Sequence, residues 1–237
     1  MDQDANLLAQ LENTTVKKKK KKGVNQKQKG KRGETWFADK LTKVSGLNFE
    51  RIYTSGASVG KKNSKRLTQL TQAQGESQLG DIISPENLTH YFIWESKNYA
   101  ELDFHNLLKP PDKFSRQTRE WLEELNFDIV SGFTKLKMNV RPLVGFLLIK
   151  VTRKGDWIIG NIDYINKMFE NIEIENHLVF ENEPSKVLQE KGFGNKYFMT
   201  DFDSFLSQNS KELFKVDKDR EEKLKKAQEA FDKIYKS

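Results

Sequence analysis

The stretch from Gly80 to Lys97 constrains the fold of this chain most, because it has the pattern of two strands joined by a turn. A short strand is predicted from Leu79 to Ile83, followed by a turn at residues 85–87. A second strand is predicted from Tyr91 to Lys97, where aromatic and β-branched residues dominate. Both faces of this strand are apolar up to its last residues, which is typical of a central strand. We therefore expect a hairpin whose second strand carries its charged end to the edge of the core.

Three charged residues, Asp81, Glu95 and Lys97, lie at the end of this hairpin. Glu95 and Lys97 point to the same side, because side chains alternate along a strand. Burying such charges is costly unless they pair or bind a metal ion. Carboxylates from two adjacent strands would suit Mg²⁺, and Lys97 would then position or deprotonate a water and offset charge on a phosphate. The alternative is a surface ion pair between Glu95 and Lys97, with Asp81 as an ordinary turn residue.

A third carboxylate, Glu34, opens a helix that is predicted from Gly33 to about Val44. The apolar residues Phe37, Leu41 and Val44 recur at i, i+4 and i+7, which defines the buried stripe of this helix. Glu34 lies three residues before Phe37 and therefore falls on that stripe. The alternative is that Glu34 only interacts favourably with the helix dipole.

Four short segments together match a known pattern: residues 30–34, 51–56, 80–83 and 95–97. In this order and spacing they resemble the PD-(D/E)xK nuclease superfamily, and more closely the Holliday junction resolvases of the archaeal and phage type. The resemblance spans about residues 30–151, and Gln117 and Arg119 look like that family's polar positions near the active site. The chain departs from the pattern at Gly80, which replaces the proline of the signature, and in the segment from residue 60 to 78, which is long for the family.

The resemblance implies an α/β fold of the restriction-endonuclease-like kind, with a central mixed sheet flanked by helices. It implies hydrolysis of phosphodiester bonds in DNA that depends on Mg²⁺, with Mn²⁺ as a substitute. Glu34, Asp81, Glu95 and the Ser96 carbonyl would arrange the metal, and Lys97 would orient the attacking water. Ser55 would assist catalysis from a loop, or would merely shape a turn.

The substrate of the resolvases is a four-way junction, which a homodimer cuts symmetrically. Two alternatives to a junction resolvase remain open. One is a nuclease of the same fold with a restriction-type or end-processing role, and the other is a non-catalytic DNA-binding protein with a nuclease-like body.

Positive charge is concentrated near the N-terminus. Residues 17–32 contain ten Lys or Arg residues and no acidic residue, which leaves 31 basic against 34 acidic residues elsewhere. We expect residues 1–32 to be a disordered arm that binds phosphates without reading sequence, although a nuclear-localisation patch or a solubility tail has the same composition. The residues predicted to contact DNA are Lys17, Lys18, Lys19, Lys20, Lys21, Lys22, Lys31 and Arg32 in the arm, Lys61, Lys62, Lys65 and Arg66 in the long loop, and Arg116, Gln117 and Arg119 in a later helix.

The rest of the chain is predicted to complete one domain, residues 33–215, followed by a charged amphipathic helix at 216–237. Further elements are expected as a helix at 115–132, a buried strand at 142–151, a strand or loop at 157–159, a helix at 162–169 and a strand at 172–180. Leu224, Ala227, Phe231 and Ile234 recur at heptad-like steps, so the last helix is expected to pack on the body or on a partner.

The absence of cysteine excludes disulfides and favours an intracellular protein. The longest apolar run, 143–149, is far shorter than the roughly 20 residues of a membrane-spanning helix, and the N-terminus lacks the core of a signal peptide. We therefore expect a soluble, cytoplasmic protein without a membrane partner, with a phage or viral gene as one source that the resemblance allows.

Overall fold

The computed structural model describes residues 26–53, 75, 78–102, 107, 116–134 and 141–235. Several residues singled out above lie outside these ranges: Lys17, Lys18, Lys19, Lys20, Lys21, Lys22, Ser55, Lys61, Lys62, Lys65 and Arg66. The side chain of Arg116 also lies outside the described part.

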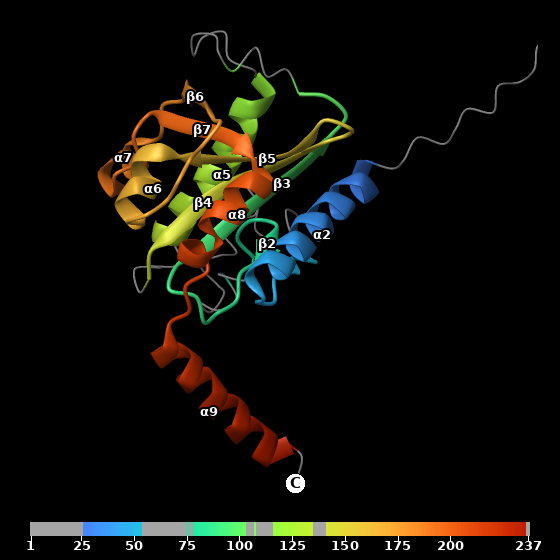
Figure 1. Ribbon diagram of the computed structural model, residues 1–237. Coiled ribbons are helices and arrows are strands. Elements are labelled where there is room, and N and C mark those ends of the chain that lie inside the picture. The colour runs from blue at the N-terminus through green and yellow to red at the C-terminus, as the bar shows by residue number, and fades with distance from the viewer. Residues whose placement is uncertain are drawn as a thin grey trace, which may run out of the picture.

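Seven strands form one mixed sheet at the centre of the protein (Figure 1). Their spatial order is β1-β2-β3-β4-β5-β7-β6, and only the pair β3 and β4 is parallel. The expected α/β fold with a central mixed sheet is therefore confirmed. The strands are β1 (Glu50–Arg51), β2 (Ile82–Ile83), β3 (Tyr91–Tyr99), β4 (Leu143–Val151), β5 (Gly155–Asn161), β6 (Leu178–Glu181) and β7 (Lys196–Asp201).

The predicted hairpin is present as β2 and β3, which pair antiparallel with Ile82 opposite Trp94. Its first strand is shorter than expected and begins at Ile82 instead of Leu79, because Gly80 has a positive φ of 73° that interrupts extended backbone. The second strand continues to Tyr99, two residues beyond the predicted end.

Helices cover both faces of the sheet (Figure 1). On one face α2 (Gln26–Ser45) packs beside α8 (Phe202–Leu213), with the Phe37 and Phe202 rings 5.0 Å apart. On the other face α5 (Arg116–Thr134) lies so close to β4 that a Cβ atom at Gly145 would come within 2.4 Å of the Ile129 side chain.

Aromatic stacking fills the core beneath α2 and α8. The Trp94 ring stacks against Phe92 and Phe146 with centroid distances of 5.1 Å each, and all three side chains are fully buried. These residues come from the central strands β3 and β4, so the hydrophobic core fixes the two strands that border the candidate site.

The first helix begins at Gln26, seven residues before the predicted start at Gly33. Residues 26–32, which were expected to belong to a disordered arm, are therefore helical. Gln and Lys are good helix formers, and the early turns are docked on β3: the Asn98 amide donates to the Lys29 carbonyl oxygen at 2.9 Å. A Cβ atom at Gly33 would lie 2.9 Å from the Asn98 Cβ, so glycine permits this close approach.

At the other end of α2, Val44 was assigned to the buried stripe, but its side chain is 43% exposed.

The C-terminal half agrees with the predicted elements in most places. The helix predicted at 115–132 is α5, and its apolar stripe of Trp121, Leu122, Leu125 and Ile129 is buried as expected. Residues 157–159 lie in the regular strand β5, and the strand expected at 172–180 is reduced to β6. Two short helices, α6 (Ile162–Met168) and α7 (Lys186–Lys191), complete this half, and Gly192 ends α7 in the left-handed conformation.

The last helix, α9 (Lys218–Tyr235), projects away from the body (Figure 1). Leu224 and Phe231 are 36% and 54% exposed, so these residues do not pack on the body, and packing on a partner stays a prediction. Among the described residues, no helix combines the length and apolar character that crossing a membrane requires.

Candidate active site

The charged end of β3 lies between α2 and α5. Asn98 faces α2, whereas the Lys97 ammonium donates to the Glu124 carboxylate of α5 at 2.6 Å. Successive residues of the strand therefore face opposite helices, as the alternation of side chains predicts. Lys97 also donates to Glu95 at 2.6 Å, and its side chain is only 17% exposed.

The environment keeps Lys97 charged. Burial by itself lowers the pKa of an ammonium group. The charge of Glu95 and the hydrogen bonds that Lys97 donates to Glu124 and Glu95 outweigh burial and raise the pKa of Lys97. For Glu95 the balance is the reverse, since burial raises its pKa more than Lys97 lowers it. This pair is therefore a nearly buried carboxylate with a firmly protonated partner.

Asp81 is fixed between β1 and β3 by its own backbone. Its N–H donates to the Trp94 carbonyl oxygen at 2.7 Å, and its carbonyl oxygen accepts from the Ile52 N–H at 2.9 Å. Its carboxylate accepts from the Ser96 N–H at 2.8 Å. Burial and the nearby charge of Glu95 raise the pKa of Asp81 well above its ordinary value, although the Ser96 hydrogen bond opposes the shift.

Gly80 explains the departure from the proline of the signature. Its φ is 73°, and a Cβ atom there would lie 2.8 Å from the Trp94 carbonyl oxygen. Its N–H donates to the Asp128 carboxylate at 3.0 Å. Proline has neither this N–H nor access to a positive φ, so the glycine allows a bond from the Asp81 turn to α5 that proline would remove.

Asp128 is itself strongly perturbed. Burial, followed by the charge of Glu95, raises its pKa to about 7, while the Gly80 hydrogen bond has the opposite effect. The Asp128 carboxyl is thus poised to hold a proton near neutral pH, even though the nearby Lys97 ammonium opposes this.

Glu34 lies on α2 beside the same site. Its carboxylate accepts from the Arg51 guanidinium at 3.2 Å, and the two side chains are 14% and 13% exposed. Glu34 also contributes to the raised pKa of Asp81, after burial and Glu95, which places its charge close to that carboxylate.

Asp81 and Glu95 are the carboxylates whose chemistry can be compared with the needs of a metal ion. Within the described ranges, no group of three or more His, Cys, Asp or Glu side chains is arranged to hold a metal ion. The charge of Glu95 nevertheless raises the pKa of Asp81, so a cation between them would stabilise both, and carboxylates are the hard oxygen donors that Mg²⁺ prefers. Because Mg²⁺ is commonly bound through one or two carboxylates and several waters, the residues present fit such an ion in their chemistry.

The other predicted residues divide between two places. Lys31 and Arg32 are exposed on the outer side of α2, where they border a shallow hollow with Arg51. Gln117 lies two helical turns before Glu124 and therefore on the same side of α5. Arg119 does not join them: it is 3.9 Å from Glu123 and borders a hollow beside β6 instead.

Glu124 and Asp128 were not predicted from the sequence. Both continue a polar stripe from Gln117 at i+7 and i+11 along α5, next to the apolar stripe of the same helix. This periodic polar row was the signal that could have identified them.

A mixed sheet with carboxylates at the end of a central strand and a lysine two residues beyond the last of them is the arrangement of a PD-(D/E)xK nuclease. A family model described as "Phage putative PDDEXK endonuclease" matches residues 25–215, and the chain belongs to this family. The matched range begins one residue before α2 and ends before α9. No curated protein and no solved structure matches the chain. The nuclease superfamily expected from the sequence is confirmed, and DNA is the substrate that a nuclease of this family implies.

Proposed function

We propose that this protein is a divalent-metal-dependent endonuclease that cleaves branched DNA. One observation carries the proposal: Lys97 is held between Glu95 and Glu124, beside an Asp81 carboxylate that is fixed on the Ser96 N–H. A protein that only bound DNA would have no use for a buried ammonium group among raised-pKa carboxylates at one point of its surface.

Each residue has a role in this proposal. Asp81, Glu95, the Ser96 carbonyl and Glu34 would hold Mg²⁺ or Mn²⁺. An ion held there would supply Lewis-acid chemistry for the hydrolysis. Lys97 would orient the attacking water and offset the charge that develops on the phosphate. The water oxygen bonds to phosphorus and loses a proton to solvent, while the phosphorus–oxygen bond to one nucleoside breaks and the departing oxygen takes a proton from solvent.

The second carboxylate partner of Lys97 matters for this role. Glu124 is 46% exposed, whereas the Lys97 side chain is 17% exposed. The Lys97 ammonium therefore keeps Glu124 as its partner on α5 whether Glu95 is protonated or ionised. This arrangement holds the lysine in one position, which is how preorganised groups contribute to transition-state stabilisation.

The branched substrate and the oligomeric state complete the proposal. A four-way junction has two equivalent scissile phosphates, and a homodimer with two-fold symmetry provides two sites for them. The exposed row of Leu224, Ala227 and Phe231 on α9 supports a contact between two copies. The lysine arm, Lys31, Arg32 and Gln117 are proposed to contact the DNA arms.

The test is cleavage of matched junction, flap, single-stranded and duplex DNA, with Mg²⁺ or with EDTA. We expect junction cleavage only with the metal and its loss in Asp81→Asn and Glu95→Gln, with DNA binding retained because shape is kept and negative charge is removed. Lys97→Ala should lose about two to three orders of magnitude in rate, since one charge-stabilising group is worth roughly 3–4 kcal/mol. Robust cleavage by both carboxylate variants would refute the site. Equal cleavage of linear duplex would assign a restriction-type or end-processing role.

A further inference from the structure

Two exposed aromatic side chains lie at the rim of the candidate active site. Trp36, on the outer side of α2, is 43% exposed, and Tyr53, just after β1, is 81% exposed. With such exposure, part of each ring surface is open to a ligand. Neither residue belongs to the carboxylate and lysine cluster described above.

Tyr53 is linked to the candidate metal site through one residue. The Arg51 guanidinium lies 4.5 Å from the centre of the Tyr53 ring, and the same guanidinium donates to Glu34 at 3.2 Å. The contact with Arg51 holds the ring by a cation–π interaction. The tyrosine ring is therefore connected through Arg51 to Glu34, which is one of the proposed metal ligands.

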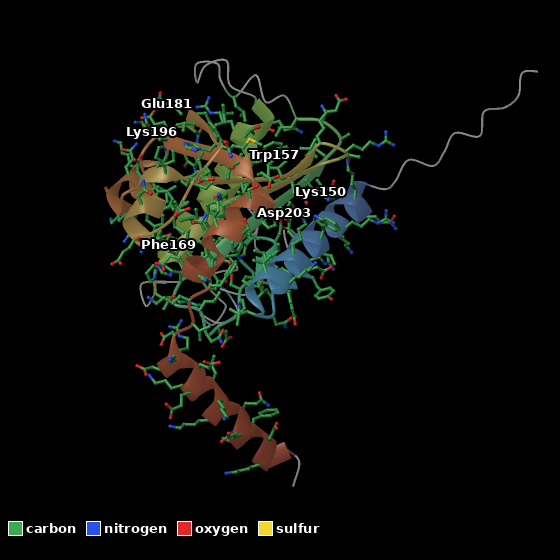
Figure 2. The ribbon with its side chains drawn as sticks, viewed as in Figure 1. Lys150, Trp157, Phe169, Glu181, Lys196 and Asp203 are labelled. Carbon is green, nitrogen blue, oxygen red and sulfur yellow. The ribbon has the colours of Figure 1, made fainter. Side chains whose placement is uncertain are left out.

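Trp36 is fixed in one orientation. Its indole N–H donates to the Asp156 carboxylate at 2.7 Å, and the Lys150 ammonium lies 3.9 Å from the ring centre. Lys40 joins the same carboxylate at 2.8 Å and also reaches Asp203. Lys150 and Asp203 are both labelled in Figure 2 on the side of the sheet that α2 covers. A ring held in this way loses little freedom when a ligand stacks on it.

Cations lie beside both rings, and Arg51 borders the hollow at Trp36 and also contacts the Tyr53 ring. Lys31, Arg32 and Arg51 line a shallow hollow that Trp36 also borders, with Asp39 as the acidic residue of its lining. Positive charge of this density suits the phosphates of a nucleic-acid backbone. Alternation of cations with aromatic rings is the usual composition of single-strand binding surfaces.

We propose that Trp36 and Tyr53 stack unpaired nucleobases of the substrate while the neighbouring cations hold its phosphates. Bases within a duplex are already stacked on their neighbours and do not offer a free face. The surface therefore selects DNA with unpaired nucleotides next to the scissile phosphate. This inference rests on the proposed nuclease function and narrows its substrate from branched DNA in general to branches that contain single-stranded nucleotides.

The test is binding of the full chain, in EDTA, to a labelled single strand that contains 2-aminopurine and to the same strand in a duplex. Stacking of a base on an aromatic side chain is worth about 1–3 kcal/mol, so Tyr53→Ala and Trp36→Ala should each weaken single-strand binding about 5-fold to 150-fold. Binding to the duplex should change less than about twofold. The quenching of 2-aminopurine by the bound protein should fall in both variants.

Matched variants separate stacking from other effects. Tyr53→Phe keeps the ring and should bind the single strand like the unmodified protein. Val179→Ala removes a side chain that is 43% exposed, like Trp36, from β6 at the sheet edge opposite β1, and should change neither affinity. Because Tyr53 is 81% exposed, its replacement leaves the core intact, and Tyr53→Ala decides the test even if Trp36→Ala loses stability.

Two results would overturn the inference: an equal loss of affinity for single strand and duplex in Tyr53→Ala, or no loss for either. Both are independent of catalysis, because binding is measured without metal. Failure to cleave any DNA in Mg²⁺ would refute the proposed nuclease function and would leave the stacking result interpretable.

Discussion

The Lys97 ammonium and the Glu124 carboxylate meet at 2.6 Å and connect the end of β3 to the middle of α5. This contact joins residues 27 positions apart in the chain, and it lies beside the Lys97–Glu95 pair of the same length. The lysine is thus fixed from two sides by carboxylates of different exposure, 11% for Glu95 and 46% for Glu124. Because of this, the effect of removing Glu124 can be separated from the effect of removing a candidate metal ligand.

Glu124→Gln should slow cleavage by roughly tenfold to a hundredfold, the range expected for a hydrogen bond between charged groups worth about 1.5–3 kcal/mol. The Michaelis constant should stay unchanged, because Glu124 positions Lys97 and is not proposed to touch DNA. The pKa of Lys97 should fall but the ammonium should stay charged over the working pH range, so the rate loss should be the same at every pH. The measurement is steady-state kinetics across pH on junction DNA.

The matched control for this variant is Glu123→Gln, one residue earlier on α5. Glu123 is 57% exposed and interacts only loosely with Arg119 at 3.9 Å, so its replacement should leave both kinetic constants unchanged. Identical rates for Glu124→Gln and Glu123→Gln would remove the positioning role from Glu124.

Asp128→Asn should change the pH dependence of stability. The folded protein binds the Asp128 proton up to about pH 7, whereas the unfolded chain releases it near the ordinary pKa of 3.8. Between these values the folded state holds more protons, so the free energy of unfolding falls as pH rises. Asparagine removes this slope and still accepts from the Gly80 N–H, so the variant should be the more stable protein above about pH 7.

The size of this gain is at most a few kcal/mol, at about 1.4 kcal/mol per pKa unit. The slope should decrease without vanishing, because the raised pKa values of Asp81 and Glu95 act in the same direction. Urea unfolding of both proteins in EDTA at about pH 5 and about pH 8 measures how the free energy of unfolding changes with pH. A variant with the same slope as the unmodified protein would contradict the assignment of the proton to Asp128.

Gly80→Ala should destabilise the protein more than Gly46→Ala does. Both glycines have a positive φ, 73° and 72°, so alanine at either position costs about 1 kcal/mol or more in backbone strain. Only at Gly80 does the new Cβ meet a backbone atom, the Trp94 carbonyl oxygen at 2.8 Å, whereas Gly46 has nothing within 4 Å. Chemical unfolding of the two variants isolates the steric part, and equal losses would show that the turn relaxes around the methyl group.

Deletion of residues 1–25 should weaken binding to every DNA by a similar factor. The deletion stops before α2 begins at Gln26 and removes the six consecutive lysines at 17–22. Each phosphate contact that is lost lowers the slope of log affinity against log salt by about 0.9. Anisotropy titrations at several salt concentrations give this slope, and an unchanged value would assign the lysines to localisation or solubility.

The central hairpin could be predicted because its information is local. Tyr91 to Lys97 alternates apolar residues to both faces, and the charged residues at its end stand out against that pattern. The helix around Phe37 and Leu41 was recognised for the same reason, since a buried stripe has its own period.

The start of α2 and the partners of Lys97 could not be predicted in this way. Residues 26–32 are polar and basic, a composition shared by unstructured arms and exposed helices, and their docking depends on a distant contact between Lys29 and Asn98. Glu124 and Asp128 reach the site only through the packing of α5 on the sheet, which local sequence patterns do not specify.

The parallel pairing of β3 with β4 has a consequence for synthesis of the protein on the ribosome. Glu95 and Lys97 lie opposite Leu147 and Ile149, and the chain must cross over through α5 before these strands can pair. A nascent chain that ends just after Lys97 contains Glu34, Asp81, Glu95 and Lys97. It still lacks strand β4 and Glu124. Contacts over such sequence distances close long loops, which slows folding. Translation products that end before α5 therefore lack part of the candidate active site.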